Sequence, residues 1–251
     1  MPLPHHVSHL VRTAALLESR ADRYADYLVE VLRPRGWTLA LEQWGREEAT
    51  HGASLRAWLA EHEAGFEFAA CMERYAALPY HDAPHRGGPL RVIDGDDSSC
   101  GVYGSAQGEL VARCVVEAMA AAYYQALAAA AVDVPSLHQL CRRHAADEAR
   151  HFSLFARMLA AVRHDEGTRR GEALAVMLRR LAALNDAQIV YASYVAGGSR
   201  GAFDLRVEGR RYRAMVLRVF GRRQVRFVGT LLARVLTAPE PRRRALAFAL
   251  A

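Results

Sequence analysis

Residues 44–52 read WGREEATHG, and residues 144–151 read HAADEARH. In each stretch a glutamate precedes a histidine by three positions, as Glu48 and His51 in the first and as Glu148 and His151 in the second. On an α-helix, residues three apart project from the same face about one turn apart. Each pair can therefore present a carboxylate and an imidazole to one metal ion. The repetition predicts two helices that face each other across a shared site.

Each motif also has a glutamate upstream at nearly the same distance. Glu117 lies 31 positions before Glu148, and Glu18 lies 30 positions before Glu48. If a short turn joins each pair of helices, antiparallel packing places the partners at similar heights. For the first helix Asp22 is an alternative to Glu18, because it lies one turn further along the same face.

The four glutamates and the two histidines are expected to converge inside one bundle. Unpaired carboxylates in an apolar core would cost several kcal/mol each, on the order of the effective penalty for a buried ion. Bound cations remove that cost, and two glutamates plus two Glu-x-x-His motifs form a carboxylate-bridged dinuclear centre. The predicted metal ligands are Glu18, Glu48, His51, Glu117, Glu148 and His151.

Three further residues near the motifs carry alternative interpretations. Glu47 and Asp147 are either solvated surface charges or acceptors for the free ring N–H of a ligand histidine on the other helix. His144 shares a helix face with Glu148 and His151. It is either a seventh ligand or a histidine of the core that supports the ligands.

The chain reads as all-α, because alanine and leucine dominate and alternating β-branched runs are scarce. The expected architecture is a four-helix bundle with one long crossover and additional C-terminal helices. We divide it into the bundle, 1–165, and accessory helices, 166–251, packed on the same domain. The first helix is expected to begin with Ser8 as its N-cap. The predicted helices cover 8–32, 38–62, 107–131, 136–162, 171–195 and an arginine-rich segment ending near 236, with the crossover at 78–108.

Composition excludes several classes of function. All 33 basic residues are arginine, so no lysine is present to form a Schiff base or a phosphate-binding loop. Four widely spaced cysteines exclude a zinc ribbon and a disulfide framework. No apolar run of the length that spans a membrane occurs, and the N-terminus lacks a signal-peptide core, so we expect a cytoplasmic protein. The net charge of +6 favours an acidic partner.

On these residues the chain resembles the ferritin-like di-iron superfamily, and most closely the acyl-carrier-protein desaturases. The second helix matches their W-x-x-E-E-x-x-H-G signature at 44–52, and the fourth helix is similar to their C-x-x-x-A-A-D-E-x-R-H stretch at 141–151. The resemblance covers about Glu18 to Val162. Ala120 departs from it, because the desaturases have a threonine there. His144 departs as well and is similar to an additional ligand of the di-iron arylamine N-oxygenases.

The resemblance implies a ferritin-like bundle that binds two iron ions, or manganese, and activates O₂ with electrons from an external donor such as a ferredoxin. The resemblance implies an oxidoreductase that desaturates or hydroxylates an acyl chain on an acyl-carrier protein. It also implies a homodimer. The alternatives are an amine N-oxygenase and a non-enzymatic iron-binding protein. Nucleic-acid binding is disfavoured by the apolar setting of Glu117, and a membrane is not expected. A substrate channel would be lined by Met119, Ala120, Tyr123 and Phe155, although core packing explains these four equally well.

Overall fold

The computed structural model describes residues 3–77, 103–182 and 187–237, except for the side chains of Asp22, Arg23 and Ala182. The predicted crossover lies mostly outside this part of the chain. Within it the regular structure is entirely helical, which confirms the all-α prediction. The helices are α1 (His5–Glu18), α2 (Ala21–Leu32), η1 (Arg33–Arg35), α3 (Thr38–His62), α4 (Phe68–Ala76), α5 (Ala106–Ala130), α6 (Pro135–Glu166), α7 (Arg170–Ala182), α8 (Ala187–Ala196), α9 (Leu205–Val219) and α10 (Arg222–Thr237).

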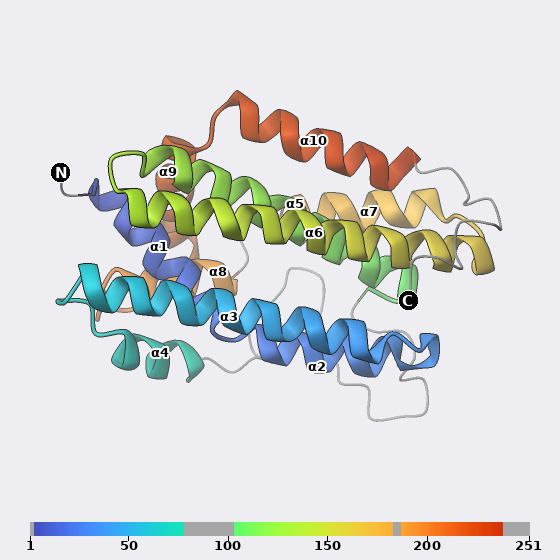
Figure 1. Cartoon of the computed structure of the whole chain (residues 1–251), viewed down its shortest axis with the longest axis horizontal. Helices are drawn as coiled ribbons and strands as arrows, with labels where there is room; N and C mark the ends of the chain where they lie inside the picture. The colour runs from blue at the N-terminus through green and yellow to red at the C-terminus, as the bar shows by residue number, and fades with distance from the viewer. Residues whose placement is uncertain (1–2, 78–102, 183–186, 238–251) are drawn as a thin grey trace.

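Two helical hairpins position the two Glu-x-x-His motifs. One is made by the long helices α5 and α6, which pack along each other, and the other by α3 against α1 and α2. In Figure 1 the α5–α6 pair lies above α3 and α2, and α10 runs along the outside of the α5–α6 pair. The C-terminal helices contact the hairpins directly, because α7 and α10 pack on α5 and α8 packs on α1.

The prediction of one continuous first helix is wrong, because the structure has two helices there, α1 and α2. The predicted segment 8–32 is interrupted after Glu18, where the amide of Arg20 bonds the carbonyl of Leu17 in a tighter turn. The Ser19 hydroxyl donates to the carbonyl of Ala15 at 2.7 Å. The N-cap prediction for Ser8 is also wrong: helix α1 begins at His5, and the Ser8 hydroxyl donates to Glu63 instead.

Helix α3 crosses the interruption at close range. A Cβ added to Gly52 would lie 2.8 Å from the backbone nitrogen of Ser19 and 3.0 Å from the carbonyl carbon of Glu18. Only glycine permits this approach, because neither neighbouring atom belongs to a flexible side chain. Gly52 therefore fixes the position of Glu18 relative to the Glu-x-x-His motif of α3.

The remaining predicted helices differ from the structure mainly at their ends and breaks. Helix α4 was not predicted. The predicted helix 171–195 is resolved into α7 and α8, with 183–186 outside the described residues, and the arginine-rich helix is divided into α9 and α10 near Gly221. None of the described helices is both long and apolar enough to cross a bilayer.

The apolar core has two principal clusters, and the polar motifs lie between them. Trp44 and Phe155 belong to one cluster, and Leu55 and Tyr124 belong to the other. Along α3, Glu48 and His51 fall between Trp44 and Leu55. The core thus surrounds the carboxylates and holds them away from bulk water.

Candidate metal centre

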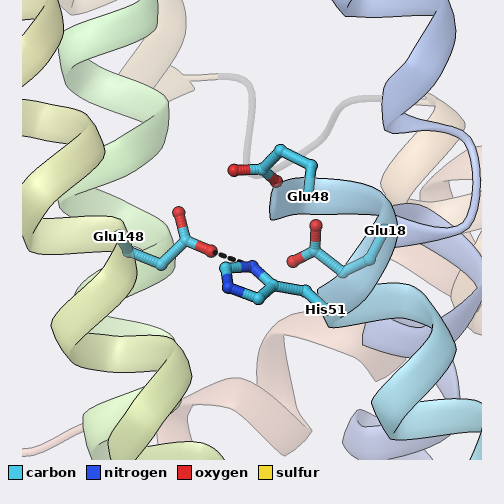
Figure 2. A group of neighbouring side chains, drawn as sticks. All are labelled: Glu18, Glu48, His51 and Glu148. Atoms are coloured by element: carbon cyan, nitrogen blue, oxygen red, sulfur yellow. Dashed lines mark ion pairs between the residues drawn. The ribbon is translucent and has the colours of Figure 1, made fainter. Parts of the chain in front are cut away.

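The structure brings all six predicted ligands together in two groups that share two members. The first group contains Glu18, Glu48, His51 and Glu148, and the second contains Glu48, Glu117, Glu148 and His151. Within each group one ligand atom of every residue lies within 4.8 Å of the others. Glu48 and Glu148 belong to both groups, so each could contribute to an ion held by either group. Figure 2 shows the first group, with Glu18 and the two α3 residues facing Glu148 on α6.

The groups are buried, and their carboxylate and imidazole atoms face one another at close range. Glu48, His51, Glu117, Glu148 and His151 are each at most 6% exposed, and Glu18 is half-buried. Four buried atoms in these groups have no hydrogen-bond partner among the described residues. They are Oε1 of Glu48, Nδ1 of His51, Oε1 of Glu148 and Nδ1 of His151. These atoms face one another in two close pairs, His51 Nδ1 with Glu148 Oε1 at 3.1 Å and His151 Nδ1 with Glu48 Oε1 at 2.8 Å. Buried carboxylates and imidazoles that converge in this way fit a bound cation.

The concentration of carboxylates shifts their pKa values. Burial, together with repulsion from Glu48, raises the pKa of Glu18 to about 8. Burial and the nearby charges of Glu117 and Glu18 raise the pKa of Glu148 to about 7, although both histidines oppose this. Burial disfavours the charged imidazole of His51, but its contacts with Glu148 outweigh this and raise the pKa of His51 to about 9. The raised pKa values show that this buried place disfavours several ionised carboxylates together, a cost that a bound cation would offset.

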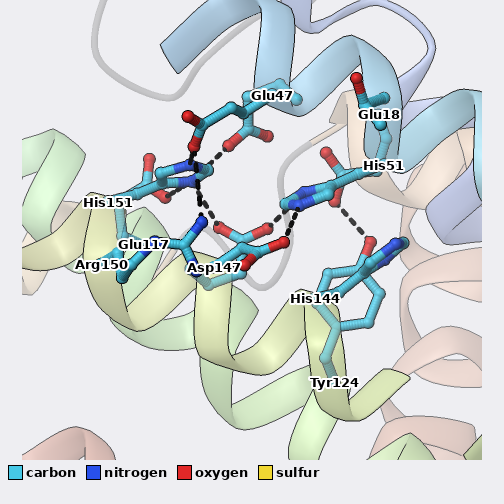
Figure 3. A network of polar contacts seen from close by, with 12 residues as sticks. Glu18, Glu47, His51, Glu117, Tyr124, His144, Asp147, Arg150 and His151 are labelled. Atoms are coloured by element: carbon cyan, nitrogen blue, oxygen red, sulfur yellow. Dashed lines mark hydrogen bonds and ion pairs between the residues drawn. The ribbon is translucent and has the colours of Figure 1, made fainter. Parts of the chain in front are cut away.

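The two histidines are oriented by carboxylates on the opposite helix. His51 on α3 donates from Nε2 to Asp147 on α6 at 3.2 Å, and His151 on α6 donates from Nε2 to Glu47 on α3 at 2.8 Å. Figure 3 shows both bonds, and Arg150 also contacts Asp147. These are the cross-helix hydrogen bonds that the sequence suggested as one of two roles. A proton on Nε2 leaves the lone pair of Nδ1 directed toward the glutamates.

This arrangement predicts that each carboxylate supports a different ion. We expect Asp147→Ala to weaken the ion bound through His51, and Glu47→Ala to weaken the ion bound through His151, each by roughly 10–100-fold. Competition titrations with Mn(II) or Co(II) measure the two affinities. If both variants bind two ions with unchanged affinity, the hydrogen bonds do not orient the ligands.

His144 lies beside the two groups but belongs to neither. Its ring stacks on His51 with centroids 4.2 Å apart, and its Nε2 lies 2.9 Å from the Ser54 hydroxyl oxygen. Ser54 donates its own proton to the carbonyl of His51, so His144 is the donor in this contact. Burial, with the charge of His51, lowers the pKa of His144 to about 3. The ring thus lies against the first group without belonging to it, and its Nδ1 is buried with no hydrogen-bond partner among the described residues.

Arg113 is a site residue that the sequence analysis overlooked. It lies one turn before Glu117 on α5, and its Nε donates to Glu117 at 3.0 Å. Its guanidinium also lies 4.8 Å from the centre of the Trp44 ring. Burial opposes ionisation of Glu117, but Arg113 lowers the pKa of this carboxyl on balance. The i, i+4 spacing of Arg113 and Glu117 was the available signal.

A cavity of about 260 Å³ adjoins the carboxylates. Its wall includes Glu18, Glu48, Glu117 and Glu148, so it reaches both groups. Three of the four predicted channel residues line it: Met119, Ala120 and Tyr123. Phe155 does not line it and instead packs edge-on against Trp44, with ring centroids 5.3 Å apart. Tyr124 also lines it.

Tyr124 links the cavity wall to the first group. Its hydroxyl donates to Glu18 at 2.6 Å, and its ring meets His144 edge-on. Glu18 is thus held in place within the first group. Asp22 was the alternative first-helix ligand in the sequence analysis, and its side chain lies outside the described residues.

Comparison of the chain with protein-family models, with curated proteins and with solved structures found no match. The chemistry of the site therefore has to be inferred from its own residues. Carboxylate oxygens and imidazole nitrogens suit Fe, Mn or Zn, and the absence of a thiolate from both groups disfavours Cu(I). The described side chains could hold a metal ion in each group.

Proposed function

We propose that the chain is an O₂-dependent oxidoreductase with a dinuclear iron centre in a ferritin-like four-helix bundle. The two groups with shared Glu48 and Glu148 support this proposal most strongly. α1–α2, α3, α5 and α6 would be the four bundle helices, each contributing at least one ligand from the predicted set. This is the ligand arrangement of ferritin-like di-iron carboxylate proteins, in which two glutamates join two Glu-x-x-His motifs.

The residues around the centre prepare it for redox chemistry. One ion would be held by Glu18 and His51, and the other ion by Glu117 and His151. Glu48 and Glu148 would contribute to both. Asp147 and Glu47 fix the imidazole rings. When bound, the iron pair supplies the electrons that reduce O₂ and the oxidising power that removes hydrogen from, or adds oxygen to, an organic substrate.

The balance of the proposed reaction requires an external reductant. Desaturation removes one hydrogen atom from each of two adjacent carbons and reduces O₂ to two waters. The reduction takes four electrons and four protons, so two of each come from the substrate and two of each must enter from a donor. Exposed arginines on α9 and α10 provide a basic surface for an acidic donor protein. They are Arg206, Arg210, Arg211, Arg218, Arg222, Arg223 and Arg226.

The cavity favours substrate oxidation over iron storage, because it places an apolar wall beside the carboxylates. Oxidation of an acyl chain is favoured over N-oxygenation of an amine, because His144, the residue similar to the N-oxygenases, stays outside both groups.

Single turnover tests the proposal. The protein is loaded with Fe(II) without oxygen, reduced, mixed with an acyl substrate or an arylamine, and exposed to O₂. We expect the acyl product to lose two hydrogens or to gain one oxygen atom, as measured by mass spectrometry with ¹⁸O₂. Iron oxidation without change in either substrate would instead indicate a ferroxidase.

A further inference from the structure

Arg20 is a charged residue of the cavity wall, and one nitrogen of its guanidinium has no hydrogen-bond partner among the described residues. It follows the turn between α1 and α2, two residues after Glu18, and lines the cavity. Its Nη2 atom is buried and has no hydrogen-bond partner among the residues that the structure describes. Its guanidinium carbon lies 5.7 Å from the centre of the Tyr75 ring, an aromatic face that holds the group without neutralising it.

The other arginines of the cavity have polar partners. Arg113 pairs with Glu117, and Arg180, on α7, donates to the Tyr103 hydroxyl at 3.3 Å. Arg20 is partly exposed, but its buried Nη2 without a partner is costly, and the planar fork of a guanidinium matches a carboxylate through two parallel hydrogen bonds. The cavity therefore has its own recognition group for an anion, separate from the cation groups.

The rest of the wall is mostly apolar. Several of its apolar lining residues come from α1, α5, α8, α9 and the residue that follows α9. They are Leu17, Val116, Met119, Ile189, Val216 and Phe220. A mostly apolar wall with a few charged groups is typical of a site for a small organic ligand.

We propose that this cavity binds a free monocarboxylic acid with an apolar body, whose carboxylate pairs with Arg20 and whose carbon chain lies along the wall toward Glu48 and Glu148. This inference deepens the proposed function by naming the substrate class, and it rests on that function only for the oxidation of the chain. A monoanion fits better than a phosphate dianion, because Arg20 supplies a single positive charge.

The proposal distinguishes a free acid from a carrier-linked acyl chain. A thioester has no carboxylate and leaves Arg20 without a partner. The basic surface of α9 and α10 would then serve the electron donor rather than an acyl-carrier protein.

Calorimetric titration of the full-length protein, without metal and with Mn(II), tests this inference independently of activity. The probes are octanoate, methyl octanoate as the neutral analogue, and octyl phosphate. We expect octanoate to bind about 10- to 100-fold more tightly than methyl octanoate, the range of one charged hydrogen-bonded contact. We expect Arg20→Gln to remove that preference. Arg142→Gln, which changes an exposed arginine of α6, should keep it.

Equal binding of octanoate and its methyl ester to the wild-type protein would overturn the proposal without any variant. Tighter binding of octyl phosphate would overturn the choice of a carboxylate. If Arg20→Gln does not fold, as judged by circular dichroism, Arg20→Lys takes its place and should show a reduced preference. Metal content is measured on the same samples. Octanoate binding with no metal uptake would refute the proposed function alone, and metal uptake without octanoate selectivity would refute this inference alone.

Discussion

Replacing Glu48 with alanine is expected to abolish the binding of both metal ions. Glu48 is the α3 member of both ligand groups, so neither group keeps a complete set without it. Loss of a residue from only one group, such as Glu18, should instead spare the other ion. Metal content after anaerobic loading with Fe(II) and desalting measures the outcome. Glu42→Ala, which removes an exposed carboxylate of the same helix, is the matched control and should load like the wild type.

Added metal should stabilise the wild-type protein against unfolding but should not stabilise Glu48→Ala. A ligand that binds only the folded state stabilises it by about 2.7 kcal/mol per site at one hundred times its dissociation constant. The wild type and Glu42→Ala should therefore gain stability when Mn(II) is added, and Glu48→Ala should gain none. Burial and the charge of Glu148 raise the pKa of Glu48, so Glu48→Gln should not destabilise the metal-free protein. A large loss of stability in metal-free Glu48→Gln would contradict the electrostatic account of the site.

Replacing Gly52 with alanine is expected to lower the free energy of unfolding by about 1–3 kcal/mol, the usual cost of overpacking. The new Cβ would meet the backbone of Ser19 and Glu18 at 3.0 Å or less, so α3 must move away from the end of α1. The movement displaces Glu18, a member of the first group only. We therefore also expect weaker binding of one ion and unchanged binding of the other. Urea unfolding and a metal titration measure the two effects.

Gly229→Ala is the matched control for this substitution. Gly229 lies in α10, and a Cβ added there meets no atom within 4 Å. Alanine should stabilise this helix by about 0.8–1 kcal/mol through its higher helix propensity. If Gly52→Ala also stabilises the protein, the close contact between α3 and the turn after α1 is not what holds Glu18 in place.

The ligand groups were largely predictable because the information is local. The Glu-x-x-His spacing fixes which side chains share a helix face, and the similar distances to Glu18 and Glu117 match the two helical hairpins. The hydrogen bonds from His51 to Asp147 and from His151 to Glu47 were one of the two roles that the same repetition indicated for these carboxylates. In these cases helical periodicity and antiparallel packing determine the geometry.

The missed features depend on contacts between distant segments. Residues 19–20 have ordinary helix-forming neighbours, and the break there accompanies the close crossing of Gly52. Phe155 follows the inward stripe of α6, but whether it lines a cavity or packs on Trp44 depends on the neighbouring helices. The position of Arg20 in the cavity wall likewise depends on Tyr75 of α4, a helix that the sequence analysis did not predict.

Anomalous diffraction from crystals of the Fe(II)-loaded protein tests the central claim most directly. We expect two peaks between α1, α3, α5 and α6, one beside Glu18 and His51 and the other beside Glu117 and His151, with Glu48 and Glu148 contacting both. A single peak, or peaks away from these six side chains, would contradict the dinuclear centre and the oxygen chemistry proposed for it.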